Sequence, residues 1–471
     1  MRAMIQSLSA RFRPRHLAMV GICLLAAAFL YLLRYDNYGI EEGAARALLI
    51  NWSIVHRIAN PIAFFGVPDL RAILFIPLDL HWAGSLPAAK VFTMLFLFAA
   101  VLMMHRWSAV RDDEEVAMLA SGLLLISPIC LMQIDAIGSG VYLLFGFISI
   151  FFLHGRLRSS ADGVPSDFFL LMLLVAFVVS LHPIGMAAPI ALLIAWRRIG
   201  RHRRRRLIMA AITATATGVA LLRWGWSGME DPGAIPSVLG DIWLGPPMIH
   251  PPHLWLGYLI GLLLLAALVA IPIWRRLDLM AGMLLVAGLI GLYHPDHAWA
   301  LVVAAFFYYL GIPVLIRLNS RIGGGGMAGQ RGLVLLVVAL VAMLCSQSGK
   351  AMSRIRTEGL KSPTDLLISV VARDAADLHR PFLAASQWPG RTMLATRRDV
   401  FPLPPADGDV ERFKRNIAPL THILFDERNP AQRPLVESLA TVTGAWETVA
   451  ITEGGVVLRR RSGGTEVAKK R

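Results

Sequence analysis

The chain has 471 residues, of which 56% are hydrophobic and 16% are charged. Soluble proteins carry about 25% charged residues, so this composition excludes an ordinary soluble protein and predicts a polytopic membrane protein with one extramembrane domain. The formal net charge is +15, but most bases stand in short tracts between apolar runs. Such tracts are topology signals, so no nucleic-acid partner is expected.

The N-terminus is basic and then apolar, as a signal peptide is, but the run 17–33 continues into charged residues without a small-residue cleavage site. We therefore expect it to be a retained first helix. Cys23, Cys130 and Cys345 each lie in or beside an apolar run, and the chain has no Cys-x-x-Cys pair. Neither a disulfide framework nor a zinc site is expected.

The first loop, residues 34–86, carries the acidic pair Glu41-Glu42. The apolar residues of 40–58 have the spacing of an amphipathic helix at the membrane interface. Glu42 and Arg46 stand four residues apart and are predicted to form a surface ion pair. Glu41 lies about 100° further round the helix, so we predict that it is the freer carboxylate. The loop alone leaves two roles open, catalysis and stabilisation of a helix N-terminus.

Eleven apolar runs approach the length of about 20 residues that spans a bilayer. They are 17–33, 87–104, 117–132, 138–153, 168–181, 184–196, 207–223, 254–273, 279–293, 298–316 and 331–345. His182-Pro183 divides the apolar stretch 168–196, which predicts a tight hairpin that leaves the flanking basic segments on one side of the membrane.

The positive-inside rule orients these spans. Bases cluster in alternate connections, as in the tract 197–206, whereas four connections contain neither Lys nor Arg: 133–137, 182–183, 224–253 and 294–297. The pattern places the N-terminus inside and the C-terminus outside, and the first loop outside with the four base-free connections.

Several polar residues fall in these outer connections. Asp135 lies between the third and fourth spans, where an ionisable residue at membrane depth is a functional candidate unless the turn emerges into water. Lys90 either holds an anion or extends along its span to the interface. The cluster 293–297 contains His294 and His297 and suits hydrogen bonds to a phosphate or sugar as well as a metal. The turn 250–253 is interpreted as structural.

Residues 346–458 have no run long enough to span a membrane. Apolar stretches at 421–425 and 448–451 predict strands, and 364–378 predicts an amphipathic helix. We therefore expect a small α/β domain on the outer face of the membrane, after a membrane domain at 1–345. The basic tail 459–471 is expected to be disordered.

The order of first span, acidic pair, helix and second span resembles the C-type glycosyltransferases, which are polytopic enzymes that use polyprenyl-phosphate sugars. The protein O-mannosyltransferase and lipid A aminoarabinose transferase group is the most similar, with Asp-Glu where this chain has Glu41-Glu42. The segment 84–91, with Lys90 in the basic position, resembles that group's Gly-Ser-x-x-x-x-Arg stretch. The segment 127–135 resembles the end of its third span, and 181–185 its His-Pro-x-Gly turn.

The resemblance implies a glycosyltransferase of the bacterial inner membrane that transfers a sugar from a polyprenyl-phosphate donor to a lipid, glycan or protein acceptor on the outer face. Transfer needs a base near the acceptor and cations on the departing phosphate. The catalytic candidates are Glu41, Glu42 and Asp135. The substrate-binding candidates are Lys90, Arg46, Arg57, His182, His294 and His297. The predicted membrane domain 1–345 contains no Asp-x-Asp, and the chain has no Trp-Trp-Asp, the two patterns of metal-dependent oligosaccharyltransferases, so no metal and no other cofactor are expected.

Two other classes stay open. A polytopic transporter or lipid flippase would show internal repeats and charged or broken helices at mid-membrane. No clear repeat is present, and the charges lie at the outer ends of spans. A non-catalytic membrane scaffold with a periplasmic binding domain would instead pack its outer-loop carboxylates against the C-terminal domain.

Overall fold

The computed structural model describes residues 40–55, 70–82, 85–159, 165–197, 203–224, 278–292, 296–313, 316, 363–377, 381–404, 410–427, 432–440, 442–452 and 454–461. The chain divides into two compact units. The first, the helical unit, contains Met1–Tyr35 and Pro87–Thr357. The second, the sheet unit, joins Asp36–Leu86 of the first loop to Glu358–Arg471. The sequence had assigned the first loop to the membrane domain instead.

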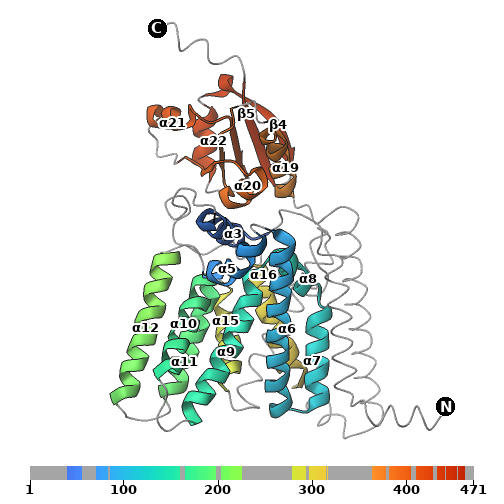
Figure 1. Cartoon of the computed structure of the whole chain (residues 1–471), viewed down its shortest axis with the longest axis vertical. Helices are drawn as coiled ribbons and strands as arrows, with labels where there is room; N and C mark the ends of the chain where they lie inside the picture. Colours follow the sequence, from blue (N-terminus) through green and yellow to red (C-terminus); the bar gives the residue numbers. More distant parts are fainter. Residues whose placement is uncertain are drawn as a thin grey trace, which may run out of the picture. The chain divides into compact units, whose positions relative to one another are not determined.

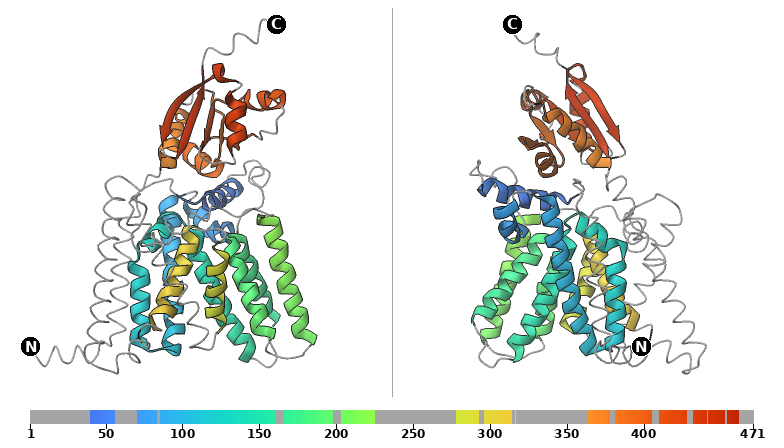
Figure 2. Two further views of the ribbon diagram at one scale, coloured as in Figure 1. Left: turned by 180° about the vertical axis from the view of Figure 1, so that it is seen from behind. Right: turned by 45° about the vertical axis from the view of Figure 1, so that its right-hand side comes forward.

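The helical unit is a bundle of helices that run roughly side by side (Figure 1, Figure 2). Its described elements are α6 (Leu86–Arg111), α7 (Glu114–Ile126), α8 (Pro128–Asp135), α9 (Ser139–Ser159), α10 (Pro165–Leu181), the 3-10 helix η1 (Pro183–Met186), α11 (Ala187–Arg197), α12 (Arg203–Trp224), α15 (Leu279–Ile290), α16 (His297–Phe306) and the π-helix η2 (Phe307–Gly311).

Apolar helices occupy every predicted span that lies among the described residues. Two of them, Leu86–Arg111 and Ser139–Leu157, are long and apolar enough to cross a membrane. A third crossing results if the bent pair α7 and α8 counts as one span, and five further apolar helices are shorter. The predicted spans 17–33, 254–273 and 331–345 lie outside the described residues, so the count of eleven stays a prediction.

The predicted span 117–132 is broken rather than straight. Its two helices meet at an angle of 53°. Pro128 is the first residue of α8, and Ser127 before it is extended, with ψ 134°. A proline cannot donate a backbone hydrogen bond and disfavours helical backbone in the residue before it, so the helix stops at Ile126 and restarts in a new direction.

The hairpin predicted at His182-Pro183 is confirmed. Helix α10 ends at Leu181, and His182 takes an extended conformation and caps η1 by accepting a hydrogen bond from the Ile184 backbone N–H. A Cβ atom at Gly185 would collide with the backbone carbonyl of Val178, seven residues earlier. Such an approach is impossible along a continuous helix, so the chain turns back on α10 at this point.

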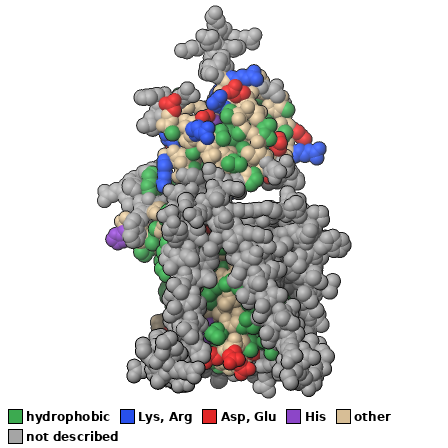
Figure 3. All heavy atoms as spheres, turned by 90° about the vertical axis from the view of Figure 1, so that its right-hand side faces the viewer, with side chains coloured by type: hydrophobic (Ala, Val, Ile, Leu, Met, Phe, Trp, Pro, Cys, Tyr) green, Lys and Arg blue, Asp and Glu red, His purple; other side chains and the backbone are tan. Residues whose placement is uncertain are grey.

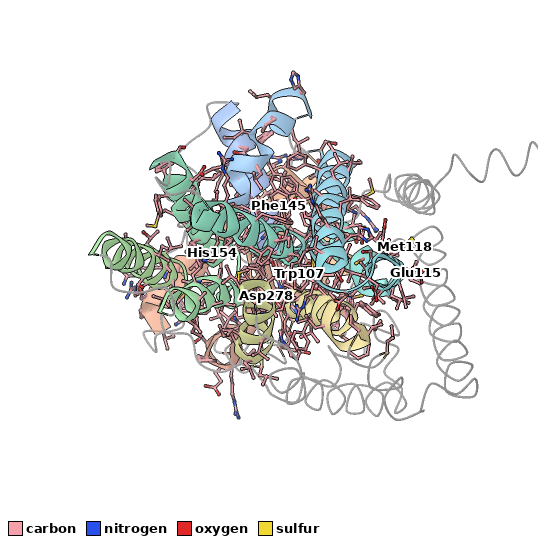
Figure 4. The ribbon with its side chains drawn as sticks, turned by 90° about the horizontal axis from the view of Figure 1, so that it is seen from below. Trp107, Glu115, Met118, Phe145, His154 and Asp278 are labelled. Atoms are coloured by element: carbon pink, nitrogen blue, oxygen red, sulfur yellow. The ribbon has the colours of Figure 1, made fainter. Side chains whose placement is uncertain are left out.

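The end of the bundle away from Lys90 is held by a second polar cluster. The Trp107 indole N–H donates to Asp278 at 3.1 Å, and the Arg111 guanidinium lies 5.1 Å from the centre of the Trp107 ring. Asp278 also caps α15 by accepting from Ala281 N at 2.8 Å. Figure 4 shows Trp107 and Asp278 side by side at the centre of this end. The cluster fixes the end of α6 against the start of α15.

Acidic side chains gather at one end of the helical unit, visible as the red patch in Figure 3. The exposed residues Asp113, Glu114 and Glu115 at the start of α7 are acidic. Carboxylates there interact favourably with the positive end of the helix dipole. The chain therefore leaves the bundle between α6 and α7 through a polar turn.

The sheet unit is built from both separated segments of the chain. It contains α3 (Glu42–Val55), α5 (Arg71–Trp82), α19 (Pro363–Ala375), β1 (Ala384–Ser386), α20 (Pro389–Thr396), β2 (Val400–Pro402), α21 (Val410–Ile417), β3 (His422–Phe425), α22 (Arg433–Ala440), the 3-10 turn η4 (Thr443–Ala445), β4 (Trp446–Thr452) and β5 (Gly455–Arg460). The predicted strands coincide with β3 and β4, and the predicted amphipathic helix with α19.

The five strands form one mixed sheet in the order β2-β1-β3-β5-β4. Strand β1 pairs in parallel with β2 and β3, and β5 is antiparallel to β3 and β4. Successive side chains of a strand point to opposite faces. Accordingly, Ile423 and Phe425 pack into one core with α21 and α22, whereas Leu424 packs into a second core with Leu367 and Val371 of α19.

Helix α3 matches the predicted amphipathic helix, and its predicted apolar positions Ile40, Ala44, Ala47 and Leu48 are buried. Other residues of α3 are buried as well, because α5 packs on it and α20 lies beside it (Figure 1). The side chain of Asn51 donates to the Ala72 carbonyl at 2.6 Å and ties α3 to α5. The helix is therefore packed inside the sheet unit.

The Gly185 contact predicts a matched pair of stability effects. Gly185→Ala should lower the apparent melting temperature of the detergent-solubilised protein, because the new Cβ meets backbone that only a shift of α10 can clear. The control Gly218→Ala, in α12, has nothing within 4 Å of the new Cβ and should be neutral or stabilising. Equal melting temperatures for the two variants would contradict the hairpin packing.

A polar network crosses the sheet at His422. Its Nε2 lies 3.1 Å from the Asp374 carboxylate, and its Nδ1 lies 3.0 Å from the Thr421 hydroxyl. Arg459 donates to the same Asp374 oxygen at 3.3 Å and to Glu447 at 2.8 Å. Burial lowers the pKa of His422 below its usual range, with a smaller contribution from Arg459 and against the attraction of Asp374.

The lowered pKa of His422 predicts a pH dependence of stability. Below the ordinary histidine pKa of about 6.5 the unfolded chain binds a proton that the folded chain resists, so stability present at higher pH is lost as the pH falls. His422→Gln should reduce the fall in melting temperature between about pH 7.5 and about pH 5.5. The exposed His81→Gln is the control. An unchanged pH dependence in His422→Gln would refute the assignment.

Candidate active site

Among the described residues of the helical unit, the most deeply buried ion pair joins Lys90 and Asp135. Lys90 Nζ lies 2.6 Å from Asp135 Oδ1, and the two side chains are 0% and 5% exposed. Lys90 stands in the second turn of α6, and Asp135 is the last residue of α8. Lys90 therefore does not extend into water, and Asp135 does not emerge into it. The sequence had left both alternatives open.

The same corner of the bundle contains further polar side chains. One turn after Lys90, the Thr93 hydroxyl lies 2.8 Å from the Tyr142 hydroxyl of α9 and donates to Ala89 O at 2.8 Å. These contacts bind α6 to α9 beside the ion pair. The break between α7 and α8 determines the position of Asp135, because it changes the direction of the last eight residues of that span.

The hairpin histidine belongs to the same end of the bundle. His182 Nε2 lies 2.8 Å from Asp296 Oδ2. His182 Nδ1 accepts from Ile184 N, so its Nε2 carries the hydrogen and donates to Asp296. Asp296 in turn caps α16 by accepting from Trp299 N at 2.8 Å. His182 thereby connects the α10 hairpin to the N-terminus of α16.

In the sheet unit, Glu41 forms an ion pair with Arg71. Arg71 Nη1 lies 2.9 Å from Glu41 Oε2, and the side chains are 2% and 28% exposed. The prediction that Glu41 is the freer carboxylate is therefore wrong. Arg71 begins α5, thirty residues away in the chain, and no helical spacing indicates a partner at that distance.

Glu42 joins the first-loop helix to the C-terminal part of the sheet unit. Arg46 Nε donates to its carboxylate at 2.9 Å, which confirms the predicted pair. The backbone N–H groups of Gly390 and Arg391 also donate to it, at 2.7 and 3.1 Å. They are the unpaired donors at the start of α20, where Pro389 has no N–H. Glu42 thus acts as a helix cap supplied by a distant segment.

Two further contacts stabilise this connection. Arg391 donates to the buried Asp365 of α19 at 2.8 Å, so α20 is fixed on its other side as well. A Cβ atom at Gly390 would lie 2.9 Å from both the Glu42 carboxylate and the Arg46 side chain. Only glycine leaves α3 room to approach α20 this closely.

The structure brings together some of the predicted residues. Lys90 pairs with Asp135, and Glu42 with Arg46, while His182 pairs with Asp296, whose motif the sequence had singled out. His297 is exposed at the start of α16. Arg57 and His294 lie outside the described residues. Among the residues that the structure describes, no three His, Cys, Asp or Glu side chains are grouped as metal ligands.

Sequence reasoning missed Arg71, Gly390 and Arg391. No local spacing relates Arg71 to Glu41, and residue type does not reveal the backbone N–H donors of α20. The one available signal was Pro389-Gly390 after Trp388, which marks a helix start with free N–H groups.

No protein-family model matches the chain, and no curated protein matches it in sequence. In structure it is similar to ArnT from Cupriavidus metallidurans in the apo state, with TM-score 0.54 and 12% identity over 94% of this chain and 98% of that one. It is also similar to ArnT from Cupriavidus metallidurans bound to undecaprenyl phosphate, with TM-score 0.52 and 13% identity. That match covers 96% of this chain and 99% of the ArnT chain.

The chain is also similar to the oligosaccharyltransferase of Archaeoglobus fulgidus, solved in complex with Zn and sulfate. The TM-score is 0.53 at 11% identity, over 93% of this chain and 72% of that one. These similarities show that the chain has the fold of the C-type glycosyltransferases, a class of polytopic membrane proteins. Within that class, the match to ArnT extends over nearly the whole of both chains.

The geometry of Glu42 predicts a structural role for its charge. Glu42→Gln should lower the stability of the protein by about 2 kcal/mol, because hydrogen bonds to a charged acceptor are weakened at Arg46 and at the start of α20. Glu437→Gln is the matched control, since Glu437 pairs with Arg433 at the same i,i+4 spacing but is 72% exposed. Thermal unfolding that does not distinguish the two variants would contradict the role of Glu42.

Proposed function

We propose that this protein is an integral-membrane glycosyltransferase that transfers a sugar from a polyprenyl-phosphate donor to a lipid, glycan or protein acceptor on the outer face of a bacterial inner membrane. The observation that carries the proposal is the buried Lys90–Asp135 pair, in a fold shared with ArnT, which has been solved with undecaprenyl phosphate. A buried ion pair contributes little to stability, so a cation kept there at the cost of desolvation indicates a role in binding.

Residues of this chain can supply the base and the cation that the transfer reaction needs. An acceptor hydroxyl or amine attacks the sugar carbon attached to the phosphate, and the bond between that carbon and the phosphate oxygen breaks. The electron pair leaves with the polyprenyl phosphate, and the acceptor loses a proton to a base. Lys90 is suited to the charge that develops on the departing phosphate, because a preorganised cation in a water-poor site stabilises it strongly.

Glu41 is the candidate base. Its carboxylate is held by Arg71 but remains 28% exposed, whereas the neighbouring Glu42 carboxylate is used by Arg46 and the α20 backbone. In this proposal Glu42 supports the first loop, and Glu41 accepts the proton. His182 and Asp296 contribute polar groups to the same end of the helical unit as Lys90.

The alternative of a transporter or lipid flippase calls for charges at mid-membrane. In the described helices of the bundle, the buried charged residues Lys90, Asp135 and Asp167 stand near helix ends. This placement favours an enzyme that acts at the membrane surface.

The proposal predicts the effect of removing the base. Glu41→Gln keeps an oxygen for Arg71 but cannot accept a proton, so transfer from a polyprenyl-phosphate sugar should fall by about 100-fold or more. The assay is transfer of a radiolabelled sugar by the purified protein in detergent, with melting temperature measured alongside. Glu411→Gln, at a side chain 77% exposed, is the control and should keep full activity. Full activity of Glu41→Gln would exclude Glu41 as the base.

A further inference from the structure

Gln133 has a buried hydrogen-bond donor with no acceptor among the residues that the structure describes. It stands on α8, two residues before Asp135, and its side chain is fully buried. Its Oε1 accepts from the Gly140 backbone N–H at 3.1 Å, but its Nε2 has no hydrogen-bond partner. A buried donor without an acceptor costs about 1 to 3 kcal/mol. The fold therefore keeps an amide N–H₂ group in a place where it is unfavourable.

The orientation of this amide is fixed by its surroundings. The Gly140 N–H requires an oxygen, so exchanging the amide oxygen and nitrogen would set one donor against another. A Cβ at Gly138 would collide with the Gln133 amide, and one at Gly140 would lie 2.7 Å from Oε1. The turn between α8 and α9 thus leaves space for this one side chain.

The same turn contains a strained residue. Ile137 has φ 53°, in the left-handed region that a β-branched residue rarely occupies. Strain of this kind persists only where the surrounding structure enforces it, and it concentrates at functional sites. Ile137 follows Asp135 by two residues and lies in the turn whose glycines leave room for the Gln133 amide.

The groups around Gln133 favour an anion. Lys90, buried against Asp135 two residues along α8, supplies a cation, and the Asp135 carboxylate balances its charge. The first turn of α16 approaches from the other side, since the Cβ position of Gly140 lies 2.9 Å from the Ala298 backbone. A helix N-terminus carries partial positive charge and binds phosphate readily. An amide donor in this setting is suited to a phosphate oxygen.

We propose that Gln133 donates its Nε2 hydrogen to a phosphate oxygen of the polyprenyl-phosphate substrate, which makes it a specificity residue for the lipid donor. The inference rests on the proposed function and adds a neutral donor to the cation Lys90. The amide selects for an oxygen acceptor, whereas Lys90 supplies charge. Bound phosphate would also give the Gln133 Nε2 the acceptor that it lacks among the described residues.

Binding of undecaprenyl phosphate to the full-length protein in detergent tests this inference. Gln133→Met keeps the length of the side chain and removes the donor, so Kd should rise about tenfold. Gln133→Glu keeps an oxygen for Gly140 but sets a second oxygen against the phosphate, so Kd should rise about 100-fold or more. Undecaprenol, which lacks the phosphate, should bind both variants and the wild type equally.

Gln387→Glu is the matched control. The Oε1 atom of Gln387 also accepts a backbone N–H, that of Asp426 at 2.8 Å, but in the sheet unit. This variant should bind undecaprenyl phosphate as the wild type does. Melting temperatures of all variants separate loss of folding from loss of binding, and affinities are compared per folded protein.

The outcomes are distinguishable. If the wild type binds, Lys90→Met loses binding, and both Gln133 variants bind normally, the inference is overturned while the proposed donor class survives; Gln133 then only supports the Gly140 turn. If the wild type does not bind undecaprenyl phosphate, the donor class fails and the inference fails with it. Weaker phosphate binding with unchanged undecaprenol binding in the Gln133 variants supports the inference.

Discussion

The buried ion pair between Lys90 and Asp135 is the constraint on which the helical unit depends. A charge at membrane depth is tolerated only with a partner, and both partners here come from helix ends. Asp135 reaches Lys90 because Pro128 breaks the α7–α8 span and turns its last segment. The hydrogen bond between Thr93 and Tyr142 lies one turn further along α6, and Gln133 stands two residues before Asp135.

A second constraint operates in the sheet unit, where two distant segments of the chain share one carboxylate. Glu42 caps α20 and pairs with Arg46, so the first-loop helix and the C-terminal sheet form one body. Glu41 pairs instead with Arg71 of α5. The adjacent acids differ because helix geometry sends one towards α20 and the other towards Arg71.

Local patterns made part of this structure predictable. Apolar runs predicted the helices α6, α9 and α10. The alternation of apolar and polar residues predicted β3, and His182-Pro183 predicted the hairpin. Among site residues, the spacing of Glu42 and Arg46 sufficed for their pair, because i,i+4 contacts are local. The pairs Lys90–Asp135, Glu41–Arg71 and His182–Asp296 join residues 30 or more positions apart, and no periodicity relates such residues.

The sequence by itself indicated a membrane protein and an acidic pair in the loop after its first apolar run, and the order of its motifs resembles that of the C-type glycosyltransferases. The membrane helices could be predicted from composition and short-range periodicity because each segment carries that pattern within itself, whereas the family came only from the resemblance of the motifs. Only the tertiary structure decided which acid supports the loop, that Lys90 is buried with Asp135, and that the Gln133 Nε2 has no acceptor among the described residues. Those facts depend on which helix ends meet, and the packing of segments that are distant in the sequence determines which ends do.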